Sequence, residues 1–137
     1  MSFDVFIQCY GETERVGLSR DSVRSLFPVV ESDSQTGYWR VQYAPDDSCD
    51  FYIGSDESDA ARLRHFVVSR PCGDERFWMA LISVLQMGSV MMYWPGSPVM
   101  VAAGTRALGL PEGMVEDLGG PVPIHSTDEI FKLLSET

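Results

Sequence analysis

Length, composition and charge limit what this chain can be. It has 137 residues, of which 45% are hydrophobic and 22% are charged, values typical of a globular chain with one hydrophobic core. Its 20 acidic and 10 basic residues give a net charge of −10. This charge argues against nucleic acid or an anionic membrane as the partner, because both bind positively charged surfaces. A basic protein partner is compatible with it.

The cysteines and the apolar segments indicate the cellular compartment of the protein. Cys9, Cys49 and Cys72 are an odd number with no CxxC spacing, which favours free thiols in a reducing environment. The first residues lack the basic region of a signal peptide, and the longest uncharged stretch, 77–105, is broken by glycines and prolines. We expect a cytoplasmic protein without a membrane span.

The first half of the chain is typical of strands. Residues 2–10 alternate apolar and other side chains, which is the period of a half-buried strand. Ser19 is placed to cap a short helix. The runs 38–44 and 49–55 alternate again on either side of four turn-forming residues, so they predict a β-hairpin.

An acidic stretch follows the turn of this hairpin. From Asp46 to Asp59 there are six acids and no base. We interpret the second half of the stretch as a solvated loop or a turn of helix, and a recognition patch is the alternative.

The middle of the chain predicts a central helix between strands. After a strand that ends near Pro71, we expect a helix over residues 74–87. Its 77–87 part is apolar around most of the helix circumference, and such a helix must be covered on more than one side. Asp74 or Gly73 is the expected N-cap. Two extended segments then flank a Pro-Gly turn.

The C-terminal helix has the clearest boundary. Ser126 and Glu129 form a capping box ahead of a helix over 127–135 that carries an apolar face. Together these elements predict one α+β domain over residues 1–137, with a mostly antiparallel sheet of five or six strands and both helices packed on it.

The candidate chemistry is sparse. Cys72 precedes a helix N-terminus, where the pKa of a thiol is lowered, so we expect it to be the most reactive of the three cysteines. A Cys–His dyad with His65 or His125 is possible on residue type alone, but structural roles are commoner. The spacing of cysteines, histidines and acids matches no metal site, and no glycine motif predicts a nucleotide, so we expect neither a metal nor a cofactor and assign no catalytic residue.

A family resemblance adds one expectation. The segments RPCGDERFW and YWPG resemble a group of small uncharacterised bacterial proteins with the pattern RPxGDxRFW, an apolar helix and then YWPG. The resemblance implies a protein similar to the immunity proteins that accompany polymorphic toxins, and it implies no catalytic residue.

Three functions are compatible with these observations. The first is a non-enzymatic domain that binds a protein, such as a basic toxin domain, through an acidic surface with exposed aromatic anchors; its candidate residues are Asp46, Asp47, Asp50, Tyr52, Asp56, Glu57, Asp59 and Trp94. The second is a small-molecule-binding or enzymatic domain with a pocket near Arg70, Cys72, His65 and Trp94. The third is a structural subunit that forms oligomers.

Overall fold

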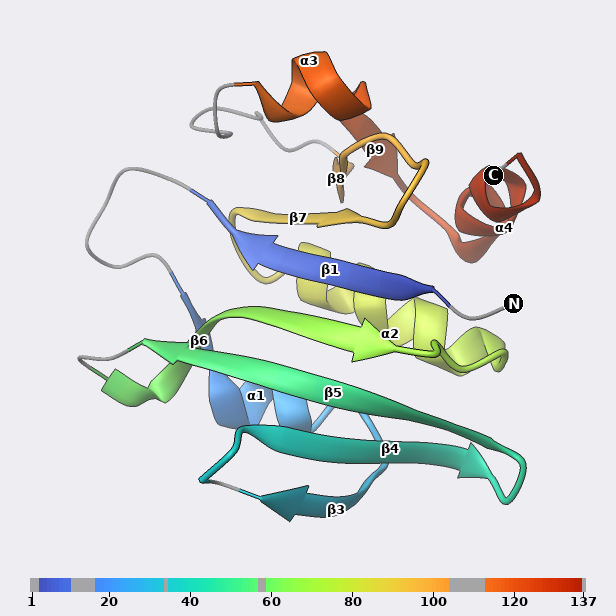
Figure 1. The fold of residues 1–137 in the computed structure, drawn as a ribbon. Coiled ribbons are helices and arrows are strands. Elements are labelled where there is room, and N and C mark those ends of the chain that lie inside the picture. The colour runs from blue at the N-terminus through green and yellow to red at the C-terminus, as the bar shows by residue number, and fades with distance from the viewer. Residues whose placement is uncertain (1–2, 11–16, 34, 57–58, 104–112, 137) are drawn as a thin grey trace.

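The computed structural model describes residues 3–10, 17–33, 35–56, 59–103 and 113–136, with the backbone alone at 55, 56, 59, 60 and 114. Within these ranges one mostly antiparallel sheet has nine strands, in the order β3-β4-β5-β6-β1-β7-β8-β9, with β2 paired to β6 (Figure 1). The strands are β1 (Asp4–Cys9), β2 (Leu18–Ser19), β3 (Val29–Asp33), β4 (Tyr38–Ala44), β5 (Asp47–Asp56), β6 (Asp59–Ser69), β7 (Val90–Tyr93), β8 (Met100–Ala102) and β9 (Val122–Ile124). The helices are α1 (Arg20–Arg24), α2 (Glu75–Leu85), α3 (Met114–Leu118) and α4 (Thr127–Ser135).

The α+β prediction is confirmed, and the strand count of five or six is wrong. Among the strands that were not predicted, β2 and β9 have only two and three residues, too short to show a period of two. Strand β3 is mostly exposed along its length, as a sheet edge can be. The second half of the acidic stretch, interpreted as a loop or a turn of helix, is instead extended wherever the structure describes it, since β5 reaches Asp56 and β6 begins at Asp59.

Helices α1, α2 and α4 pack on one face of the sheet and build the main core (Figure 1). Asp74 caps α2 with its side chain, as expected, and Phe77, Leu81, Val84 and Leu85 are fully buried. The capping box of Ser126 and Glu129 begins α4. The central-helix prediction is therefore confirmed.

A smaller core lies on the opposite face of the sheet, at the β7–β9 end. Met91 and Val101 point away from α2 and pack with Tyr10, Val99 and the partly buried Leu118 of α3. This cluster covers only that end of the face. No helix among the described residues is long and apolar enough to cross a membrane.

Candidate protein-binding face

Strand alternation divides the side chains of the sheet into two sets. In β5, Cys49, Phe51 and Ile53 are buried toward α1 and α2, and the intervening side chains point the other way. We call the surface formed by the second set on β4, β5, β6, β1 and the Tyr93 end of β7 the open face, because the small core with α3 reaches Met91 and no described helix packs over the other four strands there (Figure 1). A sheet face that is not covered by helices is a candidate binding surface.

An apolar row crosses the open face. Tyr38 is paired with Tyr52, Tyr52 with Val67, Val67 with Phe6, and Phe6 with Tyr93, so five consecutive strands contribute one residue each. The rings of Phe6 and Tyr93 stack at 5.2 Å, and those of Tyr38 and Tyr52 lie 5.8 Å apart. We call these five residues, four aromatic and one valine, the aromatic row.

Tyr52 is the most exposed member of the aromatic row. It is 50% exposed, whereas the other four side chains are half-buried. Large aromatic side chains that are exposed beside other apolar groups are common anchors in protein interfaces. The sequence analysis named Tyr52 as a candidate anchor, and the structure places its exposed ring on the open face.

A polar hollow adjoins the aromatic row. It has a volume of about 330 Å³ and is lined by Tyr38, Arg40, Ser48, Asp50 and Arg70. The Tyr38 hydroxyl donates a hydrogen bond of 2.6 Å to Asp50 Oδ1, and this bond, with burial second, raises the pKa of Tyr38 to about 12. Arg70 Nη2 lies 3.8 Å from Asp50 Oδ2. We call this cavity the polar hollow.

The backbone of Arg70 explains how its side chain reaches the polar hollow. Its φ of 53° is left-handed, a conformation that costs a non-glycine residue roughly 1–2 kcal/mol. Regular alternation after Ser69 would direct the next side chain to the opposite face. The left-handed turn instead brings the guanidinium to Asp50, although the side chain stays 73% exposed.

The predicted acidic residues do not gather on one surface. Asp46 is exposed at the β4–β5 turn, and Asp50 points into the polar hollow. The backbones of Asp56 and Asp59 are paired at the other end of β5, about 30 Å from Asp46 at 3.3 Å per strand residue. Glu57 lies outside the described residues. The expected single acidic face is therefore wrong for the acids whose positions are described.

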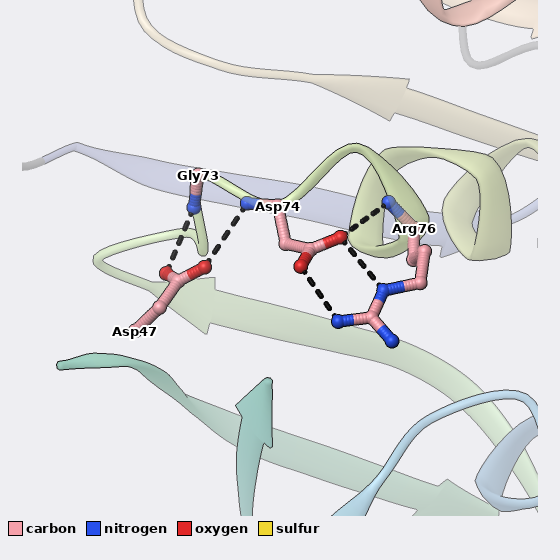
Figure 2. A network of polar contacts seen from close by, with 4 residues as sticks. All are labelled: Asp47, Gly73, Asp74 and Arg76. Carbon is pink, nitrogen blue, oxygen red and sulfur yellow. Dashed lines mark hydrogen bonds and ion pairs between the residues drawn. The ribbon is translucent and has the colours of Figure 1, made fainter. Parts of the chain in front are cut away.

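Asp47 belongs to the other face and has an internal role (Figure 2). The backbone N–H groups of Gly73 and Asp74 donate to its two carboxylate oxygens at 2.9 and 3.1 Å. Asp74 in turn accepts hydrogen bonds from the backbone and the guanidinium of Arg76. Asp47 thus joins β5 to the start of α2.

We expect Asp47→Ala to destabilise the protein by about 1–2 kcal/mol, because two N–H groups lose charge-assisted hydrogen bonds. Asp46→Ala removes the same charge from an exposed position and should change stability by about 0.5 kcal/mol or less. Urea unfolding of both variants measures this difference. Equal stability of the two variants would contradict the internal role of Asp47.

The pocket expected for a small-molecule-binding or enzymatic domain does not form. Cys72 is 2% exposed and its Sγ lies 2.8 Å from Sγ of Cys49, so the expectation that Cys72 is reactive is wrong. Trp94 is also 2% exposed and lies in the core, so the expectation that Trp94 is partly exposed is wrong. The hydrogen bond to Cys49, with burial second, raises the pKa of Cys72. The ring of His65 lies over Gly54, so of the expected pocket residues Arg70 alone lines the polar hollow.

The burial of Cys9 and Cys49 follows the strand alternation that predicted it. Both point toward the helices from β1 and β5, and burial raises the pKa of Cys9 to about 11. The thiols of Cys9 and Cys72, whose pKa values are both raised, are therefore protonated at neutral pH. Within the same described ranges, no group of three or more His, Cys, Asp or Glu side chains is arranged to hold a metal ion.

Several residues of the open face were missed by the sequence-based selection. Phe6, Tyr38, Arg40 and Tyr93 point outward from segments that were predicted to be extended, whereas Ser48 was interpreted as part of the hairpin turn. The signal was present in the period of two, but the strand order decides which outward residues become neighbours.

No protein-family model, no curated protein and no solved structure matches this chain. The resemblance to the RPxGDxRFW group stays an expectation from the sequence. Function is accordingly inferred from the open face and the charge of the chain.

Proposed function

We propose that this protein is a non-enzymatic domain that binds another protein through the open face of its sheet. The observation that carries the proposal is the aromatic row, which crosses five strands with the half-exposed Tyr52 among its members. Burying such a row against a partner removes apolar surface from water at about 25 cal/mol per Å². The polar groups beside it give the interface its rim.

The geometry favours binding over catalysis. The pocket expected for an enzyme needed Arg70, Cys72 and Trp94 together, and two of these are core residues. Cys72 is also protonated, since its contact with Cys49 and its burial raise its pKa. Among the described residues, no side chain therefore has the setting of an activated cysteine nucleophile.

The partner we propose is a basic protein. The net charge of −10 produces a negative field around the whole molecule, which speeds the approach of a positive partner without needing one acidic patch. This attraction weakens with salt because the Debye length is about 8–10 Å near physiological ionic strength. A toxin domain is one such partner, and that identification rests on the sequence resemblance.

We expect Tyr52→Ala to weaken binding of the partner by at least about tenfold, as the loss of an aromatic anchor usually does. The measurement is a titration against the product of the adjacent gene, the first candidate partner for an immunity-type protein.

Met79→Ala is the matched control. Met79 is 55% exposed, similar to Tyr52, but it lies on α2 on the other side of the sheet. Binding that is equally weakened by both changes, or by the Met79 change alone, would contradict the proposal.

A further inference from the structure

The polar hollow has a charge that differs in sign from the charge of the molecule. Arg40 and Arg70 contribute two positive charges and Asp50 one negative charge, while the chain as a whole carries −10. We propose that the polar hollow binds a carboxylate, and that in the complex this carboxylate is an acidic side chain of the bound protein. This inference rests on the proposed function for the source of the carboxylate, but not for the existence of the site.

Arg40 is the group most available to a ligand. Among the described residues its guanidinium makes no hydrogen bond and no ion pair, and its positive charge partly offsets the rise in the pKa of the neighbouring Tyr38. Glu31 is its cross-strand neighbour on β3, yet no ion pair joins the two side chains. The planar fork of an arginine matches the two oxygens of a carboxylate.

Asp50 prepares the rest of the polar hollow. Oδ1 accepts from Tyr38 at 2.6 Å, and Oδ2 holds Arg70 at 3.8 Å, longer than a hydrogen bond. Arg70 is 73% exposed, so its guanidinium can turn toward a ligand without leaving a buried contact. Ser48 lines the same cavity and can add a hydroxyl donor.

The count of charges selects a carboxylate over a phosphate. Two arginines and one aspartate give the lining a net charge of +1, and Glu31 on β3 adds a negative charge close enough to act on Tyr38. A carboxylate adds one negative charge to this site, whereas a phosphate monoester adds about 1.5 to 2 at neutral pH and is repelled more strongly by Asp50 and Glu31.

The conformation of Arg70 supports a functional reading of this site. Left-handed backbone at a non-glycine residue persists where the surroundings impose it, and such residues cluster at ligand sites. Here the strained residue is the one whose side chain reaches the polar hollow. A basic partner also carries acidic side chains, and one of these placed beside the aromatic row would fix the register of the complex.

The test is an NMR titration of the isolated protein with sodium acetate, with sodium chloride and inorganic phosphate at matched ionic strength. We expect acetate to shift the amide signals of Arg40, Ser48, Asp50 and Arg70 saturably, and Arg40→Gln to weaken this binding by at least about tenfold. Arg64→Gln is the control, because Arg64 is an exposed arginine on β6 that does not line the polar hollow.

Acetate shifts that saturate and are lost in the Arg40 variant alone support the site. No saturable shift, or equal shifts with chloride, would overturn it, and tighter binding of phosphate than of acetate would overturn the choice of carboxylate. A peptide with a single Glu and blocked ends that reproduces the acetate shifts supports a side-chain source, whereas binding of acetate but not of the peptide would overturn that source. The titration uses no partner, so its failure is distinguishable from failure of the Tyr52 experiment.

Discussion

Replacing Phe77 by alanine should destabilise the protein by about 3–5 kcal/mol, the cost of removing a buried aromatic side chain. Phe77 is fully buried on α2 and packs against Phe27, Phe51 and Trp78, so it joins the segment after α1, strand β5 and the central helix. The cavity left by the ring lies between elements that cannot all move together. A loss of this size is a large part of the stability of a typical domain.

Urea unfolding followed by circular dichroism measures this effect. Met79→Ala is the control on the same helix, because Met79 is 55% exposed and its loss should cost about 0.5 kcal/mol or less. A Phe77 variant as stable as the Met79 variant would mean that α2 is not packed across the sheet.

Gly37→Ala should cost about 2–4 kcal/mol, the sum of a left-handed backbone penalty and a steric clash. Gly37 is buried with φ 71°, and an added Cβ would collide with the backbone oxygen of Ile53. The Ile53 oxygen cannot move away easily, because the Ile53 N–H donates a hydrogen bond of 2.6 Å to the Gly37 carbonyl and holds the two backbone segments together.

Gly73→Ala is the matched glycine control. Gly73 has no positive φ, and a Cβ there meets no atom within 4 Å. Because alanine restricts the unfolded chain, this change should be neutral or stabilising by up to about 1 kcal/mol. Thermal unfolding measures the stability of the two variants. A Gly37 variant as stable as the unchanged protein would contradict the close approach of Gly37 to the backbone of Ile53 on β5.

Local patterns in the sequence predicted the elements that depend on local physics. The apolar circumference of residues 77–87, the Asp74 cap and the Ser126–Glu129 box each involve residues within a few positions of one another. The strand count failed because β2, β3 and β9 were not predicted: β2 and β9 exist only through pairing with β6 and β8, and β3 is a mostly exposed edge strand. Strands of two or three residues carry no periodic signal of their own.

The candidate site depended more on tertiary structure. Asp47 and Asp50 are three residues apart in the acidic stretch, and alternation places them on opposite faces. Asp47 accepts hydrogen bonds from the N–H groups just before α2, and Asp50 lines the polar hollow. Cys72 and Trp94 looked accessible beside glycine and proline, but packing against Cys49 and Trp78 buries them. Tyr52 was identified correctly as exposed, because its outward position follows from β5 alternation alone.

The most direct test of the open face is hydroxyl-radical footprinting of the complex with the partner, read by mass spectrometry. If the partner binds the open face, Phe6, Tyr52 and Tyr93 are protected in the complex. The exposed Met79 and Phe131 on the helical side stay as reactive as in the free protein. Protection of the same row in the free protein that grows with its concentration would assign the face to a second copy of this chain. Protection of Met79 and Phe131 with Tyr52 unchanged would contradict binding through the open face.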